Sequence, residues 1–206
     1  LKPNWILEFA ALVKQKGLIF KYKIQSRVDL LGEDALVQAL AESGCDTVWL
    51  GAESGSQHIL DAMDKGTTVN QIREATLMLK QHGIKVAYFL QFGYPGETGE
   101  DINATLQMVL EQMPDEVGIS VSYPLPGTKF YENVKCQLLE KQNWTDSDEL
   151  AMMYKATYPV TYYKILQRYV HSRYRIQRGL IRLQEFTRKP SFKMNDIRKL
   201  GSMVYH

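Results

Sequence analysis

A carboxylate and two hydroxyls follow an apolar run in the segment Thr47–Ser56, which reads Thr-Val-Trp-Leu-Gly-Ala-Glu-Ser-Gly-Ser. The apolar part is typical of a buried strand, and it runs directly into a turn flanked by glycines. Glycine lets a ligand approach the backbone, and ligands of parallel α/β proteins bind beyond the carboxyl ends of strands. Glu53 and Ser54 are therefore candidate ligand-binding residues.

Polar or aromatic side chains also stand at the ends of three other predicted strands. Arg27 follows the first strand, Gln91 and Phe92 close the third, and Ser122 and Tyr123 end the fourth. Gln91 interrupts an otherwise apolar run, so it either contacts a ligand or bonds another polar group at the sheet edge. Because the carboxyl ends of parallel strands meet at one edge, these residues could form a single site.

Hydrophobic periodicity predicts alternating helices and strands over the first 135 residues. The predicted strands are Leu18–Ile24, Thr47–Leu50, Ile84–Phe92 and Val117–Tyr123, and the predicted helices are Trp5–Lys16, Glu33–Ser43 and two that begin at Thr68 and Thr98. Thr68 with Gln71, and Thr98 with Asp101, have the spacing of a capping box. Strands that alternate with helices predict a parallel sheet, in a (β/α) barrel or a doubly wound fold.

The rest of the chain differs in composition and charge. Residues 1–150 hold 13 Lys and Arg against 21 Asp and Glu, a balance of −8, whereas residues 151–206 hold 12 against 2, a balance of +10. We expect two regions, 1–145 and 146–206, of which the second is a basic, tyrosine-rich helical extension. Glu149–Glu185 reads as helix apart from Pro159. Such an extension could bind RNA or an anionic membrane, but packing on the acidic region is a sufficient explanation, so nucleic acid is not the expected partner.

Other function classes lack their signatures in this sequence. No GxGxxG or GxxxxGK[ST] motif follows a strand, the four histidines have no metal-ligand spacing, and no Ser/His/Asp arrangement is evident. No apolar run approaches the roughly 18 residues of a membrane span. Cys45 and Cys136 lie far apart without CxxC spacing, which favours a cytoplasmic protein without a disulfide.

The strand-end turns resemble those of a known family. The matching segments are Ser26–Leu31, Ala41–Cys45, Leu50–Gln57, Asp64–Thr68, Phe92–Thr98 and Tyr123–Thr128. Over about residues 1–135 the chain resembles the radical SAM superfamily, in the branch usually associated with a cobalamin-binding domain, which includes the anaerobic magnesium-protoporphyrin ester cyclase and C- and P-methylases. The resemblance implies an α/β fold, part of a (β/α)6 partial TIM barrel with about four parallel strands and flanking helices, followed by the helical extension.

The same resemblance implies an activity and its cofactors. Members cleave S-adenosylmethionine (SAM) reductively to a 5′-deoxyadenosyl radical, and this branch uses it in methylation or oxidative cyclisation. The implied cofactors are SAM, a [4Fe–4S] cluster and, in the parent protein, cobalamin. The implied partners are a small-molecule, lipid or tetrapyrrole substrate and an electron donor of the flavodoxin or ferredoxin type.

The chain departs from the family pattern at the cluster. The family's CxxxCxxC triplet is absent, and two cysteines cannot supply three converging thiolates. We therefore expect a C-terminal fragment that holds strands three to six of the barrel and is inactive by itself, with the cluster loop and the cobalamin domain outside it. A partial sheet exposes unpaired strand edges, so we expect this fragment to self-associate.

The resemblance gives the candidate residues ligand roles beside structural alternatives. Arg27 could hold the methionyl carboxylate or pair with Asp29. Glu53 and Ser54 could bind ribose hydroxyls or the amino group, while Ser54 or Ser56 could instead cap a short helix.

The remaining candidates lie where the adenine is expected. Ser122 and Tyr123 stand near the position where adenine would stack, although a structural role explains them equally well. Phe92 is more typical of a core residue than of an adenine platform, and Gln91 is the favoured ligand contact of its strand.

Two other functions remain open. The chain could be a conventional (β/α) barrel enzyme for an anionic metabolite, which would turn over without iron or sulfide. It could also be an adaptor whose basic tail binds nucleic acid, which a salt-dependent gel shift would reveal.

Overall fold

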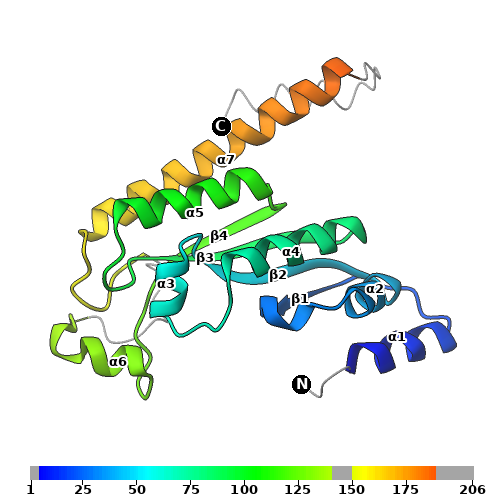
Figure 1. Ribbon diagram of the computed structural model, residues 1–206, viewed down its shortest axis with the longest axis horizontal. Helices are drawn as coiled ribbons and strands as arrows, with labels where there is room; N and C mark the ends of the chain where they lie inside the picture. Colours follow the sequence, from blue (N-terminus) through cyan, green and yellow to red (C-terminus); the bar gives the residue numbers. More distant parts are fainter. Residues whose placement is uncertain (1–4, 141–149, 189–206) are drawn as a thin grey trace.

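The computed structural model describes residues 5–140 and 150–188, and a four-stranded sheet lies at its centre (Figure 1). The strands are β1 (Tyr22–Ser26), β2 (Cys45–Glu53), β3 (Lys85–Phe92) and β4 (Glu116–Val121). The spatial order β1-β2-β3-β4 follows the sequence, and every pair is parallel. The predicted sheet of about four parallel strands with flanking helices is therefore confirmed.

Helices connect the strands and extend beyond them. They are α1 (Trp5–Gln15), α2 (Asp34–Glu42), α3 (Gln57–Ala62), α4 (Val69–Gln81), α5 (Gly99–Gln112), α6 (Lys129–Val134) and α7 (Val160–Arg188), with two 3-10 helices, η1 (Val28–Leu31) and η2 (Lys135–Gln137). Both predicted capping boxes are present. Thr68 accepts the Gln71 N–H at the start of α4, and Thr98 accepts the Asp101 N–H at the start of α5. These caps satisfy N–H groups that the first helical turn leaves free.

The two faces of the sheet are covered differently. One face packs against helices that include α2 and α4 and is buried over most of its area; its fully buried side chains are Val48, Leu50, Ala52, Val86, Tyr88, Leu90, Phe92, Ile119 and Val121. The opposite face, which we call the open face, carries the half-buried residues Trp49, Gly51, Phe89, Gln91, Gly118 and Ser120. Trp49 and Phe89 stack there with ring centroids 4.5 Å apart.

An ion pair shows how the sheet is shaped. Lys23 on β1 and Glu116 on β4 both point to the open face, and their Nζ and Oε1 atoms lie 3.6 Å apart. These are the two outer strands, whose backbones would be about 14 Å apart in a flat sheet. The pair therefore indicates that the sheet curls toward the open face, as the wall of a barrel does.

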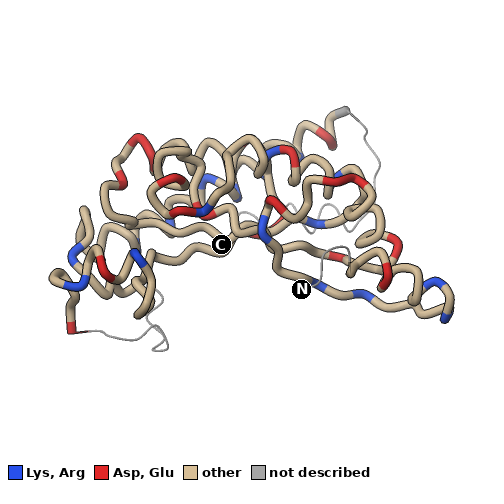
Figure 2. Tube along the Cα trace, turned by 60° about the horizontal axis from the view of Figure 1, so that its bottom comes forward, with Lys and Arg blue, Asp and Glu red and all other residues tan. Residues whose placement is uncertain are grey.

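The extension packs through one side of α7. Tyr163, Leu166, Val170 and Tyr174 are buried, and the Tyr174 hydroxyl donates to the carbonyl oxygens of Pro114 (2.5 Å) and Asp115 (3.0 Å). The acidic residues of the other region lie mainly along its helices and the turns beside them (Figure 2). The predicted boundary between residues 145 and 146 lies outside the described residues.

Two sequence predictions of secondary structure were wrong. The strand predicted for Leu18–Ile24 is shifted to Tyr22–Ser26, because pairing with β2 begins only at Tyr22 opposite Cys45. The helix predicted for Glu149–Glu185, apart from Pro159, begins only at Val160. The preceding described residues run irregularly and make one antiparallel bridge, Leu138 to Tyr154, and the residue before Pro159 is disfavoured in a helix.

Candidate functional site at the carboxyl end of the sheet

The last residue of β2 has a strained backbone. The register with β3 shifts between Gly51 and Glu53, and Glu53 has a φ of 57°. A non-glycine residue in this left-handed region costs on the order of 1–3 kcal/mol and persists only where its surroundings fix it. Irregularities of this kind re-aim side chains and often lie next to active sites. The bulge thus places the Glu53 carboxylate in a position that regular strand geometry would not give.

The Glu53 carboxylate is buried and only half satisfied. The side chain of Glu53 is 8% exposed, and its Oε1 accepts a hydrogen bond of 2.8 Å from Lys65 Nζ. Its Oε2 is buried without a hydrogen-bond partner among the described residues. A buried carboxylate oxygen without a donor is costly, so a donor supplied by a ligand or a water fits this position.

Ser54 faces the neighbouring helix instead. Its hydroxyl lies 3.1 Å from Thr105 Oγ1 on α5 and accepts the Ser56 N–H at 3.1 Å. The Gly55 N–H also donates to Thr105 Oγ1, at 2.9 Å. Ser56 occupies the N-cap position of α3, but its hydroxyl donates to Asp101 Oδ1 at 2.5 Å rather than capping the helix. These bonds tie the turn after β2 to the start of α5.

Arg27 forms the ion pair that was the alternative to a ligand role. Its guanidinium donates to both carboxylate oxygens of Asp29, at 2.9 and 3.0 Å, and to the Lys65 carbonyl oxygen at 3.2 Å. The hydrogen bond between the two side chains raises the pKa of Arg27 and lowers that of Asp29. The contact with Lys65 places Arg27 beside the residue that holds Glu53.

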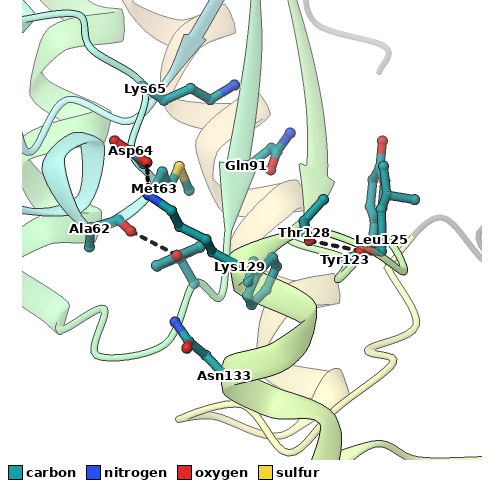
Figure 3. A pocket seen from close by; sticks show the side chains of 12 residues that line it. Ala62, Met63, Asp64, Lys65, Gln91, Tyr123, Leu125, Thr128, Lys129 and Asn133 are labelled. Atoms are coloured by element: carbon teal, nitrogen blue, oxygen red, sulfur yellow. Dashed lines mark hydrogen bonds and ion pairs between the residues drawn. The ribbon is translucent and has the colours of Figure 1, made fainter.

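A pocket of about 650 Å³ lies beyond the ends of β3 and β4 (Figure 3). It is lined by Ala62, Met63, Asp64, Lys65, Gln91, Tyr94, Tyr123, Leu125, Thr128, Lys129, Phe130 and Asn133. Of the predicted site residues, Gln91 and Tyr123 line this pocket, and Glu53 reaches its edge through Lys65. The Lys129–Asp64 ion pair, 2.8 Å, joins α6 to the segment after α3 on the other side.

The other two predicted residues do not line the pocket. Phe92 belongs to the core on the helix-covered face and is 1% exposed. Ser122 is also 1% exposed, its N–H donates to the Phe92 carbonyl at 2.8 Å, and its hydroxyl is buried without a hydrogen-bond partner among the described residues. The structure therefore brings Glu53, Gln91, Ser122 and Tyr123 to one end of the sheet, with Phe92 supporting them from the core.

Sequence reasoning assigned no site role to Lys65, Asp64, Tyr94 and Lys129. Asp64 and Lys65 lie in a segment that matched the family pattern, but their contacts with Lys129 and Glu53 join residues far apart in sequence. Tyr94 stands in the turn after β3 and donates to the Ala62 carbonyl at 2.8 Å. The motif Asp64–Thr68 was thus the available signal for Asp64 and Lys65, while nothing local marked Lys129.

Glu97 stands in the turn before α5, and its side chain is buried. It is 1% exposed, and its Oε2 accepts the Gly93 N–H at 2.6 Å while Oε1 is buried without a partner among the described residues. Burial raises the pKa of Glu97 to about 7, against the lowering effect of the Gly93 bond. Tyr154 of the extension donates to the Gly93 carbonyl, so both backbone groups of this turn residue are held by side chains.

The residues of this chain do not fit an iron–sulfur cluster. Cys45 is buried, which raises the pKa of its thiol to about 11, and Cys136 is exposed. Across residues 5–140 and 150–188, no three His, Cys, Asp or Glu side chains converge as a metal site would require. Any cluster ligands must therefore come from residues other than these.

Comparison with known proteins identifies the family. Residues 1–109 match the radical SAM superfamily. The chain belongs to this superfamily. Radical SAM enzymes use SAM and a [4Fe–4S] cluster, and the carboxyl end of this sheet offers polar groups for the first of these. Glu53 Oε2 is buried without a donor among the described residues, and Lys65, which bonds Glu53 Oε1, lines a pocket of about 650 Å³.

Curated relatives of this radical SAM chain include methyltransferases and a cyclase. It is 32% identical to an uncharacterized methyltransferase of Pyrococcus horikoshii over 70% of this chain and 31% of that protein. It is 22% identical to the bacteriochlorophyllide d C-12(1)-methyltransferase of Chlorobaculum tepidum over 99% of this chain and 46% of the relative. It is 28% identical to the anaerobic magnesium-protoporphyrin IX monomethyl ester cyclase of Rubrivivax gelatinosus over 62% of this chain and 23% of that relative. The chain spans less than half the length of each of these relatives.

Solved structures share the fold. The radical SAM methyltransferase TsrM of Kitasatospora setae, solved with cobalamin and a [4Fe–4S] cluster, gives a TM-score of 0.52 at 19% identity, over 60% of this chain and 25% of that one. Coproporphyrinogen III oxidase of Escherichia coli gives a TM-score of 0.52 at 18% identity, over 61% of this chain and 30% of that one. The four parallel strands are thus part of a radical SAM partial barrel. Within the described residues, no helix has both the length and the apolar character needed to cross a membrane.

Proposed function

We propose that this chain supplies the SAM-binding wall of a radical SAM enzyme that methylates or cyclises an organic substrate. The observation that carries the proposal is the Glu53 carboxylate, which a strained bulge holds buried. One of its oxygens has no partner among the described residues, and the other is bonded to Lys65 of the pocket lining. Methyltransferase and cyclase relatives favour these two outcomes, and cobalamin in a related methyltransferase structure favours it as a further cofactor of the parent protein.

The roles follow from the chemistry of the side chains. The free oxygen of Glu53 accepts a hydrogen bond from a ribose hydroxyl or from the amino group of SAM. Lys65 holds the Glu53 carboxylate in place through their hydrogen bond, and the positive charge of Lys65 balances the negative charge of that carboxylate. Gln91 and Tyr123 offer amide and ring surfaces to the adenosyl part. Bound SAM supplies the sulfonium whose C5′ bond radical SAM enzymes cleave.

The cysteine content limits what this chain does alone. Two cysteines cannot ligate the cluster that delivers the electron, so we propose that the chain binds SAM without cleaving it. With a chemical reductant present, the isolated chain should release no 5′-deoxyadenosine. Turnover of an anionic metabolite by the isolated chain, without iron or sulfide, would instead favour the conventional barrel enzyme.

Binding of SAM to the 206-residue chain, measured by calorimetry, tests the proposal. We expect Glu53→Gln to weaken binding by about 10–100-fold, because an amide replaces a charge-assisted acceptor while the shape is kept. Glu111→Gln is the matched control, since Glu111 is an exposed acid of α5 paired with Arg73, far from the pocket, and it should leave binding unchanged. Equal affinity of wild type and Glu53→Gln, or no binding of SAM at millimolar concentration by the folded chain, would overturn the proposal.

A further inference from the structure

Helix α7 presents three different rows of side chains around its axis. The first row is Tyr163, Leu166, Val170 and Tyr174, which recurs every three or four residues and is buried against the body of the protein. This row explains why the helix stays attached to β4 and α5. It does not explain the composition of the other two rows, which are exposed.

The second row is apolar although it faces solvent. It consists of Ile165, Tyr169, Ile176, Leu180 and Leu183, whose exposed fractions are 64%, 47%, 56%, 50% and 48%. Spacings of four, seven, four and three residues place them on one narrow stripe of a helix, about 27 Å long. We call these five residues the outer stripe. Figure 1 shows α7 continuing beyond α5, away from the sheet, so that the last turns of the helix stand clear of the body.

The third row is basic. Arg168, Arg175 and Arg182 are seven residues apart, so they share one side of α7, about 100° around the axis from the outer stripe. All three are exposed, and none of them pairs with an acid among the described residues. Arg173 flanks the stripe on its other side, with its guanidinium carbon 5.9 Å from the centre of the Tyr169 ring. The sequence of α7 contains seven Lys and Arg and a single acid, Glu185.

We propose that the outer stripe of α7 docks on an anionic lipid surface. An apolar stripe flanked on both sides by arginines is the arrangement of a helix that lies in a membrane interface, where the apolar side chains enter the headgroup boundary and the guanidinium groups reach the phosphates. This surface is separate from the proposed SAM site, so the inference does not depend on that function.

Two other occupants fit the observations less well. A second copy of α7 packed against the outer stripe would bring the two arginine rows close together, and their like charges repel. An RNA strand would match the arginines but would leave Ile165, Ile176 and Leu180 in contact with a charged backbone, since aliphatic side chains offer bases no stacking surface. The lipid surface satisfies the apolar and the basic row together.

Co-sedimentation of the 206-residue chain with vesicles tests the inference. We expect the chain to bind vesicles of phosphatidylcholine with about one third phosphatidylserine much more strongly than pure phosphatidylcholine vesicles. Arg168→Gln, Arg175→Gln and Arg182→Gln together should weaken partitioning by about 100-fold, since each basic residue near an anionic surface contributes roughly a fivefold factor. Ile176→Ser with Leu180→Ser should weaken binding comparably while the charge is unchanged.

Matched controls separate this surface from general charge or hydrophobicity. Lys14→Gln, Lys16→Gln and Lys21→Gln remove three exposed charges elsewhere, and Leu77→Ser removes an exposed leucine of α4; both should leave vesicle binding unchanged. Circular dichroism checks that every variant is folded. The inference is overturned if the chain does not bind anionic vesicles, or if the control variants lose as much binding as the α7 variants. It is also overturned if RNA binding or dimerisation depends on Ile176 and Leu180 and vesicle binding does not.

Discussion

The two ends of the sheet differ in how completely their buried polar groups are hydrogen-bonded. At the amino end, Asp115 accepts the Val86 N–H at 3.0 Å, and Lys80 donates to the carbonyl oxygens of Gln112 and Met113 at 2.5 and 2.9 Å. At the carboxyl end, Glu53, Glu97, Ser122 and Tyr163, which packs against Gly93, each bury an oxygen without a hydrogen-bond partner among the described residues, whereas the amino end has no such atom among them. Among the described residues, the buried oxygens that lack a partner thus lie at the end of the sheet that also carries the pocket.

The largest expected effect is on the free energy of unfolding, and it comes from the Glu97 carboxyl group buried at the carboxyl end of the sheet. Because burial raises the pKa of Glu97 to about 7, the folded protein holds this proton more tightly than the unfolded chain. The stabilisation of the folded state by this tighter proton binding is fully present below about pH 4.5, and it is lost as the pH rises through about 7. We expect Glu97→Gln to exceed wild type by about 3 kcal/mol in free energy of unfolding near pH 8, and to match it near pH 4.5.

Urea unfolding at the two pH values measures this difference. Asp115→Ala provides the comparison at the amino end, and it should lower stability at both pH values by about 1 kcal/mol, because it leaves the Val86 N–H without its acceptor. If Glu97→Gln kept the pH dependence of the wild type, ionisation of the buried Glu97 would not lower the stability of the folded protein, and the prediction would be wrong.

The second effect tests the close packing that fixes the turn after β2. A Cβ added at Gly55 would lie 2.5 Å from the Ala104 carbonyl oxygen and 2.7 Å from Thr105 Cα, both backbone atoms of α5. We expect Gly55→Ala to cost about 2 kcal/mol by forcing the turn away from the helix. Thermal unfolding measures the loss. Gly99→Ala, where the nearest other atom is the Tyr158 hydroxyl at 4.0 Å, should show none, and a similar loss in both variants would refute the packing argument.

A third and smaller effect measures the strain stored at the end of β2. Glu53→Gly and Glu53→Ala both remove the carboxylate, but only glycine accepts the φ of 57° without a steric penalty. The glycine variant should be more stable than the alanine variant by about 1 kcal/mol in chemical denaturation, and both should lose SAM binding. Equal stability of the two variants would show that this backbone is not strained.

The smallest effect concerns the edge of the sheet at β1. Ile19 is 99% exposed, and Leu18 and Phe20 beside it are also exposed, next to a strand that pairs on one side only among the described residues. We expect weak self-association, since exposed apolar groups beside an open strand edge favour pairing. Sedimentation velocity over a range of concentrations should show it, and Ile19→Lys should reduce it while Leu77→Lys should not. A monomer at every concentration would contradict this prediction.

Local sequence signals predicted much of this molecule. Short apolar runs and helical periodicity located β2, β3, β4 and the helices between them, because strands and helices bury side chains with different periods. The Thr68 and Thr98 caps were predicted because a capping box depends on residues three apart. Signals were weaker for β1, whose apolar neighbours Leu18–Phe20 remain exposed, and for residues 150–159, where helix-forming residues precede a proline.

By itself, the sequence determined the alternation of strands and helices, the turns that belong to the radical SAM superfamily and the lack of a cysteine triplet, because each depends on neighbouring residues. Only the tertiary structure decided that Glu53 bonds Lys65, that Arg27 is engaged by Asp29 and that Glu97 turns inward to Gly93. It also decided which rows of α7 remain exposed. The Glu53–Lys65 contact depends on the bulge in β2, which re-aims Glu53, and the local sequence gives no sign of it. The Arg27–Asp29 and Glu97–Gly93 contacts join near neighbours in sequence, but only the folded backbone shows which partner each side chain takes.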